Sequence, residues 1–156
     1  MFETTFAKLR DFIDAVAPSP ELLAAREAVA LQAACCSLLM EVARLDAAGA
    51  ERKQQAVALA MRENFAIPSE ELEAMMTRLG RPENRLTSYF KPVSLINKGY
   101  AIEEKARFIE QLWNVALADG KIDMYEEQLV RTLAGLLYVS HSDFILAKHR
   151  VLESAV

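Results

Sequence analysis

The sequence has few of the residues that interrupt or crosslink a chain. It contains five glycines, five prolines and two cysteines in 156 residues, so the elements between the breaks are expected to be long. The two cysteines, Cys35 and Cys36, are adjacent, and neighbours on a helix point about 100° apart, which argues against a disulfide between them. We predict reduced cysteines in the core of a cytoplasmic protein, with a redox role as the alternative.

Clusters of positive charge and long apolar runs are also missing. Lysine and arginine number 18 against 22 acidic residues, and no basic cluster alternates with aromatic residues, so we expect no nucleic-acid partner. The N-terminal stretch MFETTFAKLRDFIDAV contains acids and is not a signal peptide. The nearly uncharged residues 28–40 are too few to cross a bilayer. We therefore predict a cytoplasmic protein without direct membrane insertion.

Familiar catalytic motifs are absent as well. The sequence contains no glycine-rich phosphate loop, nucleophile elbow or Cys/His pair. Its two histidines, His141 and His149, belong to no HExxH motif, which argues against a zinc site. The sequence therefore predicts a protein that is not an enzyme.

What the chain does contain is helical periodicity along nearly its whole length. Apolar residues recur three and four positions apart, and no stretch alternates with a period of two. We predict an all-α fold, a single compact domain over residues 1–156 with about seven to eight helices. Its parts are an N-terminal helix at 1–17, a first repeat at about 21–80, a linker helix at about 82–98 and a second repeat at about 102–154. We expect Pro92 to bend or break the linker helix, and the N-terminal helix to lie alongside the repeats.

An internal repeat relates the two halves of the chain. A shift of 73 positions aligns their apolar residues and one acid, and one residue is lost in the loop that follows. The aligned pairs are Leu39 with Leu112, Val42 with Val115, Ala43 with Ala116, Asp46 with Asp119, Val57 with Val130 and, after the lost residue, Leu72 with Phe144. We predict two three-helix units related by a pseudo-two-fold axis.

The densest group of acids lies in the turn DGKIDMYE, residues 119–126. Gly120 suits the left-handed residue that ends a helix. Asp123 is expected to cap the next helix and Glu126 to complete a capping box, worth about 1 kcal/mol, so neither requires a ligand. Asp119 differs, because it lies at the negative end of the preceding helix dipole, where a carboxylate is disfavoured by about 0.3–1 kcal/mol.

The repeat places Asp46 at the equivalent end of its own helix. A carboxylate disfavoured in two equivalent places predicts a compensating cation, which is a Lys/Arg side chain, a metal ion or a basic group of a partner. Oxygen ligands suit Mg²⁺ or Ca²⁺, and the candidate metal ligands are Asp46, Asp119, Asp123 and Glu126. The spacing is not that of an EF-hand, because glycine directly follows the first aspartate. Helix capping with internal ion pairs is the alternative.

These residues carry a family resemblance. The core DGxIDxxE at 119–126, the preceding EEKARFIEQLWNVALADG and the following VSHSDFILAK resemble the TerB (tellurite-resistance protein B) family, in particular its uncharacterised bacterial branch. The resemblance covers about residues 25–153. It implies a compact all-α fold with a duplicated pair of acidic turns, commonly proposed as divalent-metal or partner-binding sites. It also implies a link to tellurite and stress responses and protein partners, including membrane-associated ones.

The first acidic turn departs from the family pattern. Ala47 stands at the glycine position, Ala50 at the second aspartate and Lys53 at the glutamate, with Glu51 as a partial substitute. This loss of carboxylates argues against a symmetric two-site metal centre. Lys53 is placed to pair with an acid of the other turn and so to replace a cation there.

The sequence as a whole favours a non-enzymatic interaction or sensor module of a bacterial stress system. Its acidic turn would receive a divalent cation or a basic partner. One alternative is a scaffold in which the acids cap helices and pair internally. Another is metal-assisted hydrolysis, in which carboxylates hold Mg²⁺ to activate water. A homodimer is left open.

Overall fold

The computed structural model describes the backbone of residues 2–154, and the side chains from residue 4 onward except that of residue 14. Over these residues the chain forms eight α-helices and no strand, which confirms the all-α prediction. The helices are α1 (Phe2–Val16), α2 (Pro20–Arg44), α3 (Ala50–Asn64), α4 (Ser69–Leu79), α5 (Phe90–Gly99), α6 (Ile102–Ala116), α7 (Met124–Leu136) and α8 (His141–Ser154), with a 3-10 turn η1 (Pro82–Asn84) before α5.

Short polar side chains begin several of these helices. The Ser19 hydroxyl accepts a hydrogen bond from the Leu22 N–H (3.1 Å), and Pro20 follows as the first residue of α2. The Ser140 hydroxyl accepts from the Asp143 N–H (3.1 Å) at the start of α8. These caps satisfy N–H groups that have no partner within the helix and fix where each element starts.

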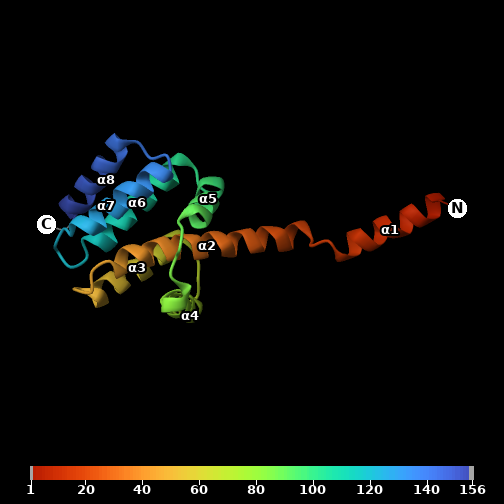
Figure 1. The fold of residues 1–156 in the computed structure, drawn as a ribbon, viewed down its shortest axis with the longest axis horizontal. Helices are drawn as coiled ribbons and strands as arrows, with labels where there is room; N and C mark the ends of the chain where they lie inside the picture. The colour runs from red at the N-terminus through yellow and green to blue at the C-terminus, as the bar shows by residue number, and fades with distance from the viewer. Residues whose placement is uncertain (1, 155–156) are drawn as a thin grey trace.

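The core lies around helices α2 and α6. Helix α2 contacts α3, α4, α5 and α6, while α6 contacts α7 and α8, so each half of the chain forms a three-helix unit (Figure 1). The apolar face of residues 108–116 is buried, and Trp113 is fully enclosed. Leu45 and Leu136 continue the apolar spacing of their helices but are exposed, because each lies at the end of a helix where the chain leaves the core.

The predicted linker helix is shorter than expected and Pro92 does not break it. Helix α5 begins at Phe90, after η1 and an irregular stretch, so the prediction of a helix from residue 82 was wrong. Pro92 is the third residue of α5. The first N–H groups of a helix lack an intrahelical partner in any case, so a proline costs no hydrogen bond there.

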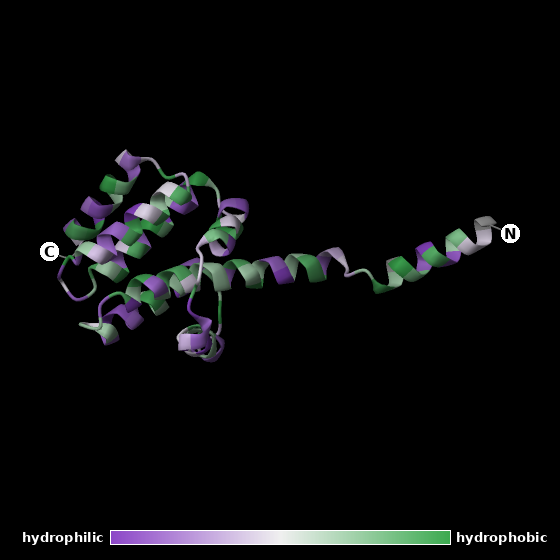
Figure 2. Ribbon diagram, in the orientation of Figure 1, coloured by the Kyte–Doolittle hydropathy of each residue, from purple (hydrophilic) through white to green (hydrophobic). Residues whose placement is uncertain are grey.

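The N-terminal helix does not lie alongside the repeats, and that prediction was wrong. Helix α1 points away from the bundle beyond the first half of α2 (Figure 1). Residues 20–29 of α2 are exposed, so the bundle ends before α1 begins. The apolar stripe of α1 is therefore exposed to solvent, with Phe6 68% and Phe12 66% exposed. Figure 2 shows apolar residues along α1.

Helix α2 is long and apolar enough to cross a membrane when judged by length and composition alone. The core helix of a globular domain meets the same criterion, and residues 34–36 and 38–43 of α2 are buried in the bundle.

Candidate acidic-turn site

The two acidic turns lie against each other where α2 meets α3 and α6 meets α7. Asp46 and Asp119 adopt the same local structure: each Oδ1 accepts a hydrogen bond from the backbone N–H two residues later, at 3.0 Å from Ala48 and 3.1 Å from Lys121. This match at equivalent repeat positions supports the aligned register. By accepting from the backbone N–H two residues later, each aspartate tightens the turn that follows its helix.

Gly49 allows the close approach of the two turns. Its φ of 70° is in the left-handed region, and a Cβ at this position would lie 2.4 Å from the Asp119 Cβ. Only glycine meets both conditions without strain. The sequence reasoning missed Gly49, although a glycine directly before a predicted helix was a readable signal. Gly120, at φ 79°, is left-handed as predicted.

Lys53 occupies the centre of the site. Its side chain is fully buried, and its Nζ lies 2.7 Å from Glu126 Oε1, 3.8 Å from Asp119 Oδ2 and 3.9 Å from Asp46 Oδ2. The predicted pairing of Lys53 with an acid of the other turn is confirmed. Lys53 and Glu126 are the equivalent residues of the two repeats, 73 positions apart, so they face each other across the boundary between the units.

Glu126 was expected to fold back and complete a capping box, and this was wrong. Its side chain is 1% exposed and points inward to Lys53. Asp123 does cap α7, with Oδ1 accepting from the Tyr125 N–H at 3.4 Å. A local sequence pattern cannot tell whether a glutamate returns to its own backbone or turns toward a buried cation on another helix.

The electrostatics of Glu126 are unusual. Burial raises the pKa of this carboxyl, the Lys53 ammonium lowers it, and the carboxylates of Asp123 and Asp119 raise it further. Only Oε1 is paired: Oε2 is buried and has no hydrogen-bond partner. A buried polar atom without a partner costs roughly 1–3 kcal/mol, so it marks a position where a ligand would be stabilising.

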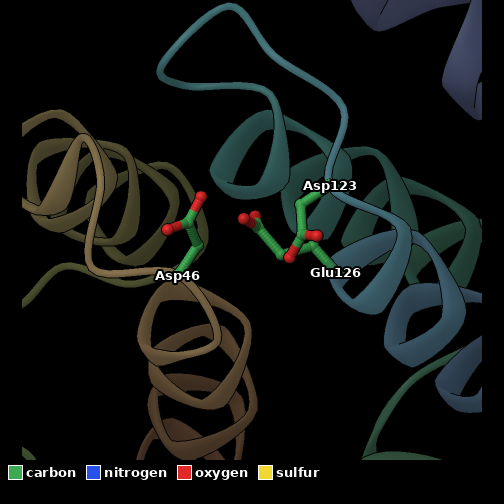
Figure 3. A group of neighbouring side chains, drawn as sticks. All are labelled: Asp46, Asp123 and Glu126. Atoms are coloured by element: carbon green, nitrogen blue, oxygen red, sulfur yellow. The ribbon is translucent and has the colours of Figure 1, made fainter.

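The acidic-turn cluster, defined as Asp46, Lys53, Asp119, Asp123 and Glu126, carries excess negative charge. Four carboxylates surround one ammonium. Oxygens of Asp46, Asp123 and Glu126 lie within 4.8 Å of one another, and this group could hold a metal ion (Figure 3). Asp119, also predicted as a ligand, lies on the Lys53 side and is outside that group.

A divalent ion fits only one part of this cluster. The central position is taken by the Lys53 ammonium, which would repel a metal ion bound to Glu126 Oε1. The group formed by Asp46, Asp123 and Glu126, whose Oε2 is unpaired, offers the hard oxygen donors that Mg²⁺ and Ca²⁺ prefer.

The surroundings of the cysteines and of His141 indicate structural roles for these residues. Burial raises the pKa of both thiols, Cys35 and Cys36, to about 12, so they are neutral and poorly nucleophilic near neutral pH. The His141 ring packs on Phe144, with ring centres 5.9 Å apart. Met124 is 73% exposed and Tyr125 70% exposed, so this pair belongs to the surface beside the acidic turn.

With this geometry described, the comparison with known families is informative. The model of the family described as tellurite resistance protein TerB matches residues 32–149. The chain therefore belongs to the TerB family, and the acidic-turn cluster lies within the matched segment. No curated protein and no solved structure gives a match.

Proposed function

We propose that this chain is a non-enzymatic, cytoplasmic interaction module of a bacterial stress system, in which a divalent cation bound at the acidic turns controls a protein contact. Mg²⁺ or Ca²⁺ would bind between Asp46, Asp123 and Glu126, beside the built-in charge of Lys53. The observation that carries this proposal is the buried, unpaired Oε2 of Glu126 in a cluster whose negative charge Lys53 does not balance.

The surface beside the cluster supports a role in protein contact. Ile122, Met124 and Tyr125 are 49%, 73% and 70% exposed, and they belong to the same turn and helix start as Asp123. Flexible methionine and amphipathic tyrosine side chains are well suited to partner surfaces. A cation that tightens the acidic turns would fix these side chains in place, and a partner with basic groups would match the remaining charge.

The structure also favours a second candidate, a scaffold that needs no ion. Here the Lys53–Glu126 pair at 2.7 Å joins the two turns directly, and the other acids cap helices and close turns. The two candidates differ in their response to metal.

Thermal unfolding with EDTA, and then with excess Mg²⁺ or Ca²⁺, separates them. A ligand that binds only the folded state at a hundred times its dissociation constant adds about 2.7 kcal/mol. If a cation binds at the acidic turns, the metal should raise the melting temperature of the wild type. Asp123→Asn should lose this rise, whereas Asp11→Asn, on the exposed helix α1, should keep it. Melting that is indifferent to both metals in all three proteins would reject the cation proposal and leave the scaffold.

A further inference from the structure

A cavity of about 850 Å³ lies in the first repeat, between α2, α3 and α4. Its volume is within the range of about 300–1,000 Å³ typical of small-molecule sites. It is separate from the acidic-turn cluster, none of whose five residues lines it. The apolar residues that line it include Met40, Ala58, Leu72 and Met76.

The equivalent space in the second repeat is filled by the protein itself. Under the repeat register, Met40 corresponds to Trp113 and Leu72 to Phe144, and the two aromatic rings pack with centres 5.2 Å apart. Cations cover these rings: Arg131 lies 5.0 Å from the centre of the Phe144 ring. Lys148 lies 5.3 Å from the centre of the Trp113 ring.

The first repeat has neither an aromatic ring nor a cation at any of these four positions. Trp113 and Phe144 are replaced by Met40 and Leu72, and the positions of Arg131 and Lys148 are occupied by Ala58 and Met76. The three-helix frame is retained, because α2 contacts α3 and α4 as α6 contacts α7 and α8. The cavity therefore lies at the positions where the second repeat carries two aromatic rings and two cationic side chains.

The cavity is also positively charged, in a chain whose net charge is −4. Arg44, Arg62 and Arg81 line it against a single acid, Glu73. Arg44 is held by Glu41 at 2.8 Å and by the Leu79 carbonyl. Among the residues that the structure describes, Arg62 and Arg81 have no ion-pair partner, so two guanidinium groups are available to a ligand.

We propose that this cavity binds a small aromatic carboxylate. The ring would lie against Met40, Leu72 and Met76, with sulfur–aromatic contacts to the methionines. The carboxylate would bind Arg62 or Arg81, whose planar guanidinium forms paired, charge-assisted hydrogen bonds with such a group. This site is independent of the cation proposed at the acidic turns.

Calorimetric titration with 2-naphthoate, and with neutral 2-naphthamide as the matched ligand, tests the proposal. We expect 2-naphthoate to bind at least about tenfold more tightly than the amide, and the methyl NMR signals of Met40 and Met76 to shift on binding. The variant Met40→Trp, which copies the second repeat, should abolish binding. Arg62→Gln combined with Arg81→Gln should weaken it at least about tenfold, whereas Arg52→Gln, elsewhere on α3, should leave it unchanged.

Three results would overturn the inference. They are no binding of 2-naphthoate at millimolar concentration, equal affinity for the acid and the amide, and unchanged binding to a folded Met40→Trp variant. If Met40→Trp does not fold, Ala58→Leu fills the same cavity from α3 and is held to the same standard.

Discussion

Replacing Lys53 with methionine tests the centre of the acidic-turn cluster most directly. Lys53 is fully buried, and its Nζ lies 2.7 Å from Oε1 of the equally buried Glu126. Methionine preserves much of the apolar stem but removes the ammonium, which leaves Glu126 as an uncompensated buried charge. Loss of one partner from a buried pair costs about 3–5 kcal/mol. We expect the free energy of unfolding, measured by urea denaturation near pH 7, to fall by about that amount.

A double variant separates the effect of charge from that of packing. Removing both partners of a buried ion pair in favour of apolar residues is often neutral or stabilising, so Lys53→Met combined with Glu126→Leu should recover most of the loss. A double variant as unstable as the single one would assign the loss to packing and refute the ion-pair reasoning. So would a loss below about 1 kcal/mol in the single variant, which is the scale of a solvent-exposed pair.

The same variant should show a characteristic pH dependence. Burial raises the pKa of Glu126 in the folded state above its unfolded value, and removing Lys53 takes away the group that lowers it. A carboxyl with a raised pKa binds protons more readily when folded, so the stability deficit should shrink as the pH is lowered from about 7 to about 5. Urea unfolding across this range measures the difference from wild type, and a deficit that grows toward low pH would contradict the assignment.

Three further outcomes are expected. Gly49→Ala should lower the free energy of unfolding in the urea assay by more than about 1 kcal/mol, because the position has φ 70° and lies against the opposite turn. Gly135→Ala, in open space on α7, should raise the free energy of unfolding by about 0.5–1 kcal/mol in the same assay. Cys35 and Cys36 should resist iodoacetamide near pH 8 in the folded protein and react once it is unfolded, as mass spectrometry would show; rapid labelling of the native chain would contradict their burial. The exposed apolar stripe of α1 should pair with that of a second copy, so light scattering should show a dimer. Ile13→Asp should convert this dimer to a monomer, whereas a substitution on the polar face of α1 should leave it a dimer. A monomeric wild type would refute this.

Much of the acidic-turn site was readable from the repeat alone. The register that aligns Asp46 with Asp119 also aligns Lys53 with Glu126, and the departure of Lys53 from the family pattern predicted its pairing with the other turn. Such inferences work because a duplicated fold brings equivalent residues of the two repeats face to face. A change of charge at one of the two positions therefore predicts an ion pair between them.

Features that depend on long-range packing were not readable. The pattern around Asp123 and Glu126 satisfies a capping box in one dimension, but a buried ammonium on another helix determines where the glutamate points. The apolar stripe of α1 predicts a packing partner without saying which one, and the first half of α2 carries α1 beyond the bundle. The cavity depends on how α2, α3 and α4 pack together, which no local pattern records.

The position of Lys53 opposite Glu126 has a consequence for how such a fold can arise. In a symmetric pair of identical single-repeat chains, this position would carry the same residue twice, and two glutamates or two lysines repel each other. Only an intermediary of opposite charge would hold them together. Joining the two repeats in one chain removes that constraint, since each copy mutates separately and a lysine can come to face a glutamate. Duplication thus allows the two halves to be joined at this position by their own charges, with no ion between these two side chains.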